Sequence, residues 1–374
     1  MRVLIFSMTC GEGHNSIAKA IKQEFEDQLG NKVVCDIVQT YGFDEERVKK
    51  ENDRLLKVIK YIPRLYQMTW NILRKRNPKK PSRVFNNEIK GCDKYFIEQI
   101  KAFKPDMIIC THVYASGVIN QLIERGELDK GIITSTVGFD FCLSPFWECS
   151  TKLDYVFSVD EKMDKDLLAK NWNKNQIYAC GIPIRKDFRT VVANNRNGED
   201  FTALVIAGGT GIGNTLKVVE SIVKNSPDTN VIVVNGRNQK TFNQIEELIK
   251  ERSLTNITNL GFVNNLPDYF KKSDVVICRC GGCGVSEILC FGVPMIIREK
   301  LINNEKINKK FFIENGCALG MKRLSDAGKL VEKLKKNPQL CKEMGQNCAN
   351  FAKPNAAKDL VDFLVKKYEE RKEQ

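Results

Sequence analysis

The sequence predicts an α/β protein made of two doubly wound halves, each a parallel sheet covered by helices. Three observations predict this fold class. Short runs rich in Val and Ile alternate with longer helical patterns, which is the rhythm of βαβ units. Each half opens with a strand that runs into a glycine-rich turn. The 374 residues exceed the size of about 250–300 residues at which single cores stop growing, so we expect two domains.

The first domain is expected to span residues 1–195. It begins with a strand at residues 2–7, a glycine loop and a helix at residues 16–29, which Gly30 ends in the position that favours glycine. Further strands are expected at residues 33–38, 107–111, 131–137 and 155–159, with helices between them.

The second domain is expected at residues 201–352, after a polar, turn-rich linker at residues 192–200. Its strands are expected at residues 201–207, 231–234, 275–278 and 294–297, each followed by a helical pattern. A charged helix at residues 356–373 closes the chain. We expect this last segment, residues 353–374, to pack back on the first domain.

Composition and cysteine usage indicate a cytoplasmic globular protein. The chain is 42% hydrophobic, and its 14 cysteines are scattered, several of them within apolar runs, which favours reduced thiols over disulfides. The apolar run at the N-terminus is too short for a signal peptide or a membrane span. We therefore expect neither export nor a transmembrane segment.

Two histidines lie where open α/β sheets bind ligands. Gly11, Gly13 and His14 sit between the first strand and its helix, where free backbone N–H groups favour an anion. Ser16 replaces the third glycine of a dinucleotide fingerprint, and no Gly-Lys-Ser/Thr of a P-loop follows. The other histidine of the chain, His112, follows the strand at residues 107–111. Each could equally bond its local backbone.

A second glycine turn, residues 279–287, has the chemistry to hold a diphosphate. It runs from a strand through Gly281 and Gly282 into a helix that carries Glu287, a carboxylate suited to vicinal hydroxyls. A rival interpretation is a metal site formed by cysteines. Their spacing lacks the paired C-x2-C knuckles of structural zinc, so we expect no metal; the cysteines concerned are Cys278, Cys280, Cys283 and Cys290.

Eight ordered motifs over about residues 1–315 resemble glycosyltransferase family 28, the group that includes monogalactosyldiacylglycerol synthases and diacylglycerol glucosyltransferases. The family's Thr-Asp-Phe corresponds to Phe139-Asp140-Phe141 here. The other motifs are Gly11-Glu12-Gly13-His14, Gly181-Ile182-Pro183-Ile184-Arg185, Gly208-Gly209-Thr210-Gly211, Asn235-Gly236-Arg237-Asn238, Gly261-Phe262-Val263, Gly281-Gly282 to Glu287, and Asn304-Glu305 with Asn308.

This resemblance implies a GT-B fold, two Rossmann-like domains facing a cleft, and an inverting transfer from a UDP-hexose without a cofactor or metal. The second domain would bind the nucleotide sugar. Phe262 would cover the uracil, the backbone of Val263 would pair with it, and Glu287 would bind the ribose. The sugar would contact Asn304, Glu305 and Asn308, and the leaving diphosphate would be neutralised by Arg185, Gly209, Thr210 and Gly211.

An inverting transfer needs a base for the acceptor hydroxyl, and the resemblance points to the first domain. His14 suits the task because an imidazole near its ordinary pKa is available at neutral pH. Asp140 could be the base itself or could orient His14, and this choice stays open. Gly11, Gly13 and His112 are assigned to the acceptor side.

A basic strip predicts the partner surface. The formal net charge is +13, and residues 54–83 hold ten basic residues and no acidic one, which implies a phosphate-rich partner. Aromatic residues interleave with the cations, as in a membrane-interface segment, and no stacking module indicates nucleic acid. A solvated basic face is the alternative. The residues assigned to an anionic membrane are Lys60, Trp70, Arg74, Lys75, Arg76, Lys79 and Lys80.

The sequence therefore predicts an enzyme at the inner face of the cell membrane that transfers a hexose, with glucose as the first candidate, from a UDP-sugar to diacylglycerol. Two alternatives remain open. One is a family-28 enzyme with a polyprenyl-linked or soluble acceptor, and the other is a regulator that binds UDP-sugars without turnover.

Overall fold

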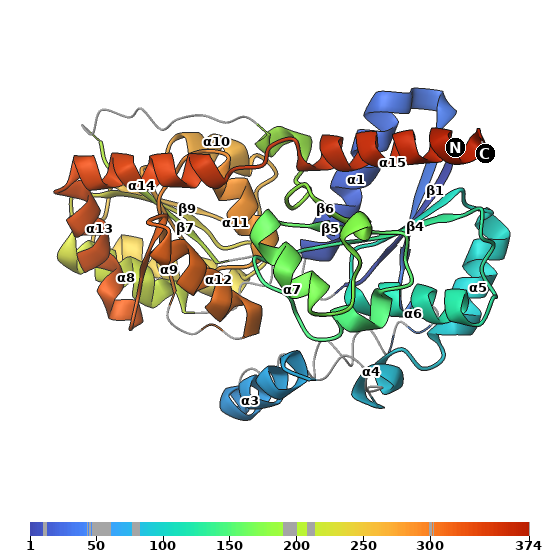
Figure 1. Ribbon diagram of the computed structural model, residues 1–374. Coiled ribbons are helices and arrows are strands. Elements are labelled where there is room, and N and C mark those ends of the chain that lie inside the picture. The colour runs from blue at the N-terminus through green and yellow to red at the C-terminus, as the bar shows by residue number, and fades with distance from the viewer. Residues whose placement is uncertain are drawn as a thin grey trace. The chain divides into compact units, whose positions relative to one another are not determined.

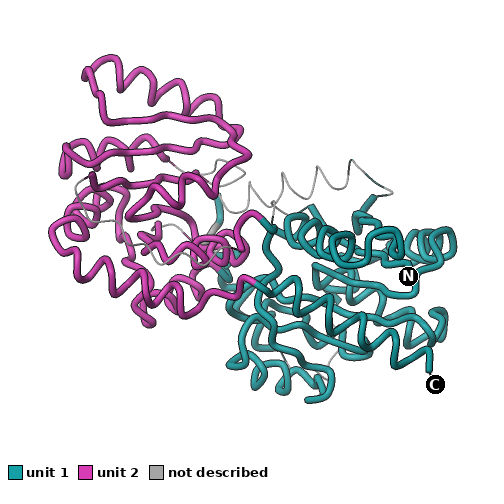
Figure 2. Tube along the Cα trace, turned by 90° about the horizontal axis from the view of Figure 1, so that it is seen from above, with its two compact units in different colours: residues 1–186, 302–304, 355–374 teal, residues 187–301, 305–354 magenta. Residues whose placement is uncertain are grey.

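The computed structural model describes residues 1–9, 13–42, 44, 46, 61–76, 83–189, 200–207, 214–298, 301 and 303–373. Within them the chain forms two compact units, which are coloured separately in Figure 2. Unit 1 comprises residues 1–186, 302–304 and 355–374, and unit 2 comprises residues 187–301 and 305–354.

Unit 1 is built on a six-stranded, all-parallel sheet with the order β2-β1-β3-β4-β5-β6. The order runs outward on both sides of β1 and β3, as doubly wound sheets do. The strands are β1 (Arg2–Ser7), β2 (Val34–Gln39), β3 (Met107–Cys110), β4 (Ile133–Val137), β5 (Tyr155–Ser158) and β6 (Ile177–Ala179). The register pairs Val3 with Met107 and Met107 with Ile133, so the carboxyl ends of β1, β3 and β4 lie at one edge.

The helices of unit 1 cover this sheet, and the last helix of the chain packs against the first (Figure 1). Gly30, with φ of +54°, follows the end of α1, which confirms the expected stop. The helices are α1 (Gly13–Leu29), α3 (Pro63–Arg74), α4 (Arg83–Glu88), α5 (Cys92–Phe103), α6 (Val113–Glu124), α7 (Asp164–Leu168) and α15 (Ala356–Lys372).

Unit 2 repeats the architecture with a second six-stranded parallel sheet, in the order β12-β11-β10-β7-β8-β9. The strands are β7 (Thr202–Ile206), β8 (Asn230–Val234), β9 (Ile257–Leu260), β10 (Val275–Cys278), β11 (Met295–Ile297) and β12 (Ala318–Gly320). The helices are α8 (Thr215–Asn225), α9 (Gln239–Glu251), α10 (Leu266–Lys271), α11 (Gly282–Leu289), α12 (Asn303–Glu314), α13 (Ala327–Lys335) and α14 (Pro338–Phe351).

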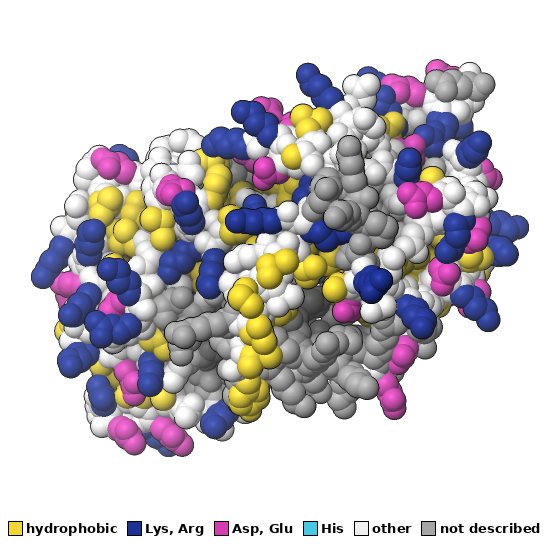
Figure 3. Space-filling model, turned by 60° about the horizontal axis from the view of Figure 1, so that its bottom comes forward, with side chains coloured by type: hydrophobic (Ala, Val, Ile, Leu, Met, Phe, Trp, Pro, Cys, Tyr) yellow, Lys and Arg dark blue, Asp and Glu magenta, His cyan; other side chains and the backbone are white. Residues whose placement is uncertain are grey.

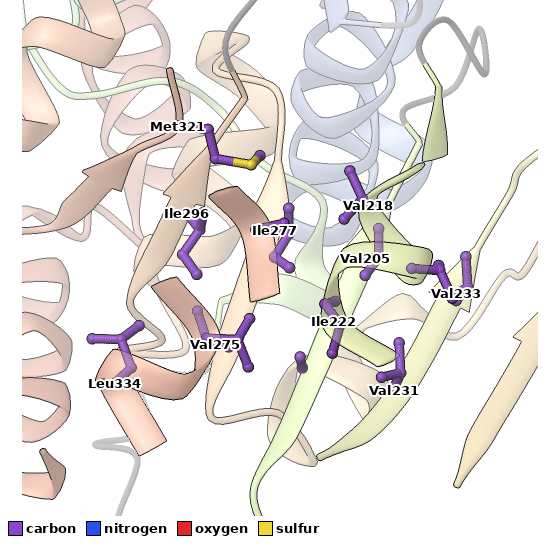
Figure 4. Packing of buried hydrophobic residues seen from close by; sticks show 14 of the residues in the cluster. Val205, Val218, Ile222, Val231, Val233, Val275, Ile277, Ile296, Met321 and Leu334 are labelled. Atoms are coloured by element: carbon purple, nitrogen blue, oxygen red, sulfur yellow. The ribbon is translucent and has the colours of Figure 1, made fainter. Parts of the chain in front are cut away.

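The core of unit 2 forms where the central strands meet α8 and α13 (Figure 4). Val205, Val275 and Ile277 are at most 1% exposed and pack against Ile222 and Leu334 from the two helices. Side chains on both faces of these strands are buried, which accounts for the continuous runs of Val and Ile that predicted the strands.

The expected α/β class with two parallel sheets is confirmed. Three strands were not expected from the sequence: β6, β9 and β12. They form the outer strands of their sheets on one side or the other, and they are three or four residues long. Such short edge strands carry little of the apolar pattern on which a prediction depends. Among the described residues, no helix is long and apolar enough to cross a membrane.

Candidate functional site

His14 lies in the first turn of α1, beside the carboxyl ends of β1 and β3. Its Nδ1 is 2.5 Å from the carbonyl oxygen of Thr111, the residue that follows β3. A carbonyl only accepts, so Nδ1 carries the hydrogen and Nε2 keeps its lone pair. The residue is 7% exposed, and burial lowers the pKa of His14 to about 4, although the bond to Thr111 opposes this shift. A neutral imidazole with its lone pair on Nε2 therefore lies at this edge, and its pKa is lower than the ordinary value expected from the sequence.

His112 has the opposite tautomer. It caps the N-terminus of α6, where its Nδ1 accepts a hydrogen bond of 3.1 Å from the backbone N–H of Tyr114. The hydrogen of the neutral ring is then on Nε2. Burial, followed by the charge of His14, holds the pKa of His112 well below its ordinary value. The centroids of the two imidazoles are 4.7 Å apart, which pairs a ring that can accept a proton with a ring that can donate a hydrogen bond.

The loop after β4 adds an aromatic ring and a carboxylate to this edge. The Phe139 ring meets the His14 ring edge to face, with centroids 4.3 Å apart. Asp140 is 8% exposed, and its Oδ2 accepts a hydrogen bond of 2.7 Å from Nδ2 of Asn304. Asn304, at the start of α12, belongs to unit 1. The structure thus brings together four residues that the sequence singled out: His14, His112, Asp140 and Asn304.

A polar network that the sequence analysis missed fixes the start of α1. Ser7, the last residue of β1, donates to Oδ1 of Asn15 over 2.7 Å, and Gln39 of β2 donates to the same oxygen over 3.0 Å. Thr111 donates to Ser7 over 3.2 Å. These side chains hold the residue next to His14 against three strand ends. The signal that could have found them is their position, since Ser7 and Thr111 end expected strands.

In unit 2 the glycine turn after β10 is braced by α12. Glu305 forms a two-point ion pair with Arg279, with Nε and Nη2 at 2.9 and 2.5 Å from its oxygens. Asn308 is fully buried and donates to the carbonyl of Cys280 over 2.8 Å. Both residues were expected to contact the sugar. Here they position the turn, and their contact with a sugar stays a prediction.

This turn leads into α11, with Gly281 at its N-cap and Gly282 as its first residue. Glu287 lies within α11 and is 8% exposed. After β9, the outer strand of the same sheet, the Phe262 ring is 61% exposed, and Arg237 lies over it, 5.5 Å from the ring centroid. Val263 follows it and is partly buried. An exposed ring with a cation above it is the kind of platform on which a flat base can stack.

The four cysteines around this turn are buried thiols. Burial raises the pKa of both Cys278 and Cys290 to about 12, so both thiols keep their protons at neutral pH. Across the part of the chain that the structure describes, no group of three or more His, Cys, Asp or Glu side chains is arranged to hold a metal ion.

Two further predicted residues lie in unit 1, and others lie outside the described part. Arg185 belongs to unit 1 and follows the turn at Gly181, whose φ of +97° requires glycine. Gly13 is the first residue of α1. The predicted residues outside the described ranges are Gly11, Lys60, Lys79, Lys80, Gly209, Thr210 and Gly211.

The structure corrects the assignment of three residues of the basic strip to an exposed membrane surface. Trp70 is 8% exposed. Arg74 donates to the carbonyl of Leu143 over 3.1 Å, and Arg76 forms an ion pair of 2.5 Å with Glu148, whose side chain is 1% exposed. The two arginines turn toward the protein because the loop after β4 offers them a carbonyl and a carboxylate. Of the described basic residues of the strip, Lys75 and Arg83 are exposed.

Comparison with known proteins identifies both halves of the chain. Residues 14–184 match the family model "Monogalactosyldiacylglycerol (MGDG) synthase", and residues 203–351 match "Glycosyl transferases group 1". The processive diacylglycerol beta-glucosyltransferase of Bacillus licheniformis is 26% identical, with 98% of this chain and 95% of the relative covered. The enzyme of the same name from Bacillus subtilis is 25% identical, with 98% and 96% covered.

Solved structures show the same fold. MurG of Acinetobacter baumannii superimposes with a TM-score of 0.63 at 16% identity, covering 98% of this chain and all of that one. UDP-GlcNAc 2-epimerase of Neisseria meningitidis gives 0.59 at 14%, with 98% and 100% covered. These likenesses show the GT-B fold alone. The family matches over both halves and the relatives over nearly the whole chain identify it as a glycosyltransferase of the group that includes monogalactosyldiacylglycerol synthases and diacylglycerol glucosyltransferases.

Proposed function

We propose that the protein transfers a hexose, with glucose as the first candidate, from a UDP-sugar to the hydroxyl of diacylglycerol, with inversion at the anomeric carbon. The relatives in Bacillus that match this chain over nearly their whole length are named processive diacylglycerol beta-glucosyltransferases. Anabaena HepE, a structural neighbour with a TM-score of 0.57 at 10% identity, was solved in complex with UDP-glucose. These names support the choice of donor and acceptor.

The observation that carries the proposal is the 2.5 Å hydrogen bond from Nδ1 of His14 to the carbonyl of Thr111, which leaves the lone pair of the neutral ring on Nε2. In the proposed reaction this nitrogen takes the proton of the acceptor hydroxyl while the acceptor oxygen bonds to the anomeric carbon. The bond from that carbon to the diphosphate breaks, and UDP leaves with its electron pair. Thr111 keeps its hydrogen bond to Nδ1–H and so stabilises the imidazolium that forms. His112 donates a hydrogen bond from Nε2 to the oxygen of the acceptor hydroxyl. The carboxylate of Asp140 adds a negative charge at this edge of the sheet.

For the donor we propose unit 2, with the uracil on Phe262, the ribose on Glu287 and the diphosphate at the turn before α11. The exposed ring of Phe262 and the buried carboxylate of Glu287 support these roles. Asn304, Glu305 and Asn308 are proposed at the sugar, and Arg185, Gly209, Thr210 and Gly211 at the diphosphate. The enzyme is proposed to work at the inner face of the cell membrane, on anionic lipid.

The test is an incubation of the purified chain with UDP-[14C]glucose or UDP-[14C]galactose and diacylglycerol vesicles, followed by separation of the lipid products. A labelled glycolipid supports the proposal. Label on a polyprenyl-linked or soluble acceptor supplied in parallel, with none on diacylglycerol, favours the first alternative. UDP binding without any product favours the regulator. In the productive case, His14→Ala should lower turnover about 10²- to 10⁴-fold and spare UDP affinity.

Glu287→Ala tests the donor site separately. Loss of a charge-assisted hydrogen bond should weaken UDP binding by about 1.5–3 kcal/mol in calorimetry. The control is Glu314→Ala, which removes an exposed carboxylate of the same unit that pairs with Lys310. If Glu287→Ala and Glu314→Ala bind UDP equally well, Glu287 has no part in the donor site.

A further inference from the structure

One aromatic ring, that of Phe139, contacts both histidines of unit 1. It meets the ring of His14 at 66° with centroids 4.3 Å apart, and it lies nearly parallel to the ring of His112, at 13° and 6.2 Å. Phe139 is half-buried, whereas His14 is 7% exposed. A ring that touches His14 and keeps part of its own surface in solvent shields that imidazole from water.

The backbone on both sides of Phe139 is anchored. The N–H of Gly138 donates to the carbonyl of Phe157 in β5 over 2.8 Å, and a Cβ at position 138 would lie 3.1 Å from the same oxygen. On the other side, Asp140 accepts the bond of 2.7 Å from Asn304. These contacts fix the backbone from which the Phe139 ring projects.

Both histidines also lie at the N-terminus of a helix. His14 is the second residue of α1, and His112 is the N-cap of α6. The helix dipole disfavours a positive charge at these positions. Shielding from water adds to this effect, because a buried imidazolium loses its hydration. Of the two effects, the shielding is the one that a substitution of Phe139 can remove.

We propose that Phe139 is a positioning residue that shields His14 and His112 from water, keeps both rings neutral in mildly acidic solution and so leaves Nε2 of His14 able to take a proton. The inference rests on the proposed function, in which that proton comes from the acceptor hydroxyl. The lowered pKa of each histidine has the same direction, and burial is its first cause. The reaction should therefore continue at a pH at which an ordinary imidazole is protonated.

The titratable groups next to His14 do not account for its neutral form. His112 is neutral too and carries no charge. Two carboxylates belong to neighbouring segments: Asp140 in the loop after β4 and Glu12, which lies outside the described residues. A carboxylate favours the imidazolium and so acts in the opposite direction. Lys19, the first charged residue of α1 after His14, is exposed.

The field of the whole protein is the rival cause. The formal net charge is +13, and many side chains on the face that Figure 3 shows are Lys or Arg. The other elements packed on α1 add little charge near His14. The ends of β1 and β2 present uncharged side chains, Ser7 and Gln39, and Asp362 of α15 bonds to α1 about four turns further on. Salt screens a surface field, whereas it does not restore hydration under Phe139.

The experiment is NMR of the full chain labelled with 15N-histidine. The sequence has two histidines, so the spectrum shows these alone, and His112→Asn assigns them. At pH 7 His14 should carry its hydrogen on Nδ1 and His112 on Nε2. At pH 5 the imidazole of His14 should be about one-tenth protonated in the wild type, as a pKa of about 4 requires. In Phe139→Thr it should be at least about half protonated.

Two matched variants serve as controls. Phe139→Tyr keeps the ring and should titrate as the wild type does. Tyr114→Ser removes a different ring, which meets His112 with centroids 4.8 Å apart, and should leave the protonation of His14 unchanged. Thermal unfolding reports whether each variant has folded. If Phe139→Thr does not fold, Phe139→Val takes its place with the same expected result.

Three outcomes overturn the proposal. The first is equal protonation of His14 at pH 5 in the wild type and in Phe139→Thr. The second is an equal rise in Tyr114→Ser, which would mean that any loosening of the cluster has this effect. The third is loss of the difference between the wild type and Phe139→Thr at 1 M salt, where the Debye length is about 3 Å, since this would assign the effect to surface charge.

Turnover gives a second measurement. The ratio of kcat at pH 5 to kcat at pH 7 should be at least about twofold lower in Phe139→Thr than in the wild type, with KM for the UDP-sugar unchanged. The NMR titration needs no substrate, so the two proposals fail in different ways. If His14 titrates as expected but no glycolipid forms, the role of Phe139 stands and the proposed reaction is wrong. If glycolipid forms and His14 titrates alike in both chains, the reaction stands and the role of Phe139 is wrong.

Discussion

The two histidines of unit 1 are buried in their neutral form, because burial lowers the pKa of both. The folded state therefore becomes less stable at low pH. An unfolded histidine titrates near pH 6.5, whereas burial lowers the pKa of His14 in the folded chain to about 4. The unfolded state therefore binds a proton first. The contribution of His14 to stability is complete above pH 6.5 and is lost as the pH falls toward 4.

The first prediction follows from this shift. Between pH 7 and pH 5 the titration of His14 should lower the free energy of unfolding of unit 1 by about 2 kcal/mol. His14→Gln does not titrate, so its unfolding free energy should fall by about that much less over the same interval. Urea denaturation at the two pH values measures the difference. Equal losses in the wild type and the variant would show that His14 has an ordinary pKa.

His112 has two separable tasks, a helix cap and a hydrogen-bond donor. His112→Ala removes the bond to the N–H of Tyr114 and should lower the free energy of unfolding by about 0.5–2 kcal/mol. Asn is a favoured N-cap, so His112→Asn should recover most of this loss. If Nε2–H orients the acceptor, His112→Asn should not recover turnover. Recovery of both stability and turnover by Asn would leave His112 with the cap alone.

At the scale of elements, an ion-pair cluster joins α3 to the loop that carries Asp140. The carboxylate of Glu148 lies 2.5 Å from Arg76 and 3.2 Å from Lys170, and its side chain is 1% exposed. The same loop contributes Leu143, which accepts from Arg74. Two of the cations in the basic strip are thus used inside unit 1, where they attach a surface helix to the loop after β4.

Removing the buried charge should loosen this attachment. Glu148→Gln leaves two cations without their carboxylate, which should cost about 3–5 kcal/mol of the unfolding free energy of unit 1. The control is Glu127→Gln, whose ion pair with Arg125 is about two-fifths exposed on both sides and contributes at most about 1 kcal/mol. Chemical denaturation compares the two. A loss for Glu148→Gln no larger than that for Glu127→Gln would mean that the cluster does not hold α3.

At the scale of the whole molecule, each unit has its own sheet and core, and the chain ends in the unit where it began. Leu360 of α15 is fully buried in unit 1, where α15 packs against α1, and Arg371 near its end pairs with Asp154 over 3.0 Å. Ile277 of β10 is fully buried in the core of unit 2. A substitution at Leu360 or at Ile277 can therefore destabilise one unit at a time.

We expect the two units to unfold as separate transitions. Leu360→Ala and Ile277→Ala should each cost about 2–5 kcal/mol through the cavity left behind. In calorimetry, Leu360→Ala should lower the midpoint of one transition and Ile277→Ala that of the other. A single transition that both substitutions shift equally would show that the two units unfold together.

The sequence by itself determined the fold class and the positions of most strands. The Val- and Ile-rich runs that become β1, β3, β7 and β10 are buried on both faces. Nearly every residue of such a strand is therefore apolar, and the strand can be recognised from its own sequence. The turn at Gly281 and Gly282 and both histidines could be singled out because they follow such strands. The short edge strands β6, β9 and β12 were missed because their neighbours in the sheet, not their own residues, hold them.

Tertiary structure alone decided what these residues do to one another. The pattern of α3 shows which side chains share a face, but which face is buried depends on Leu143 and Glu148, about 70 residues further along the chain. The tautomer of His14 depends on the carbonyl of Thr111, and the pairing of Glu305 with Arg279 depends on a turn from another strand. Periodicity is a property of neighbouring residues, whereas burial and hydrogen bonding are set by residues that only folding brings near.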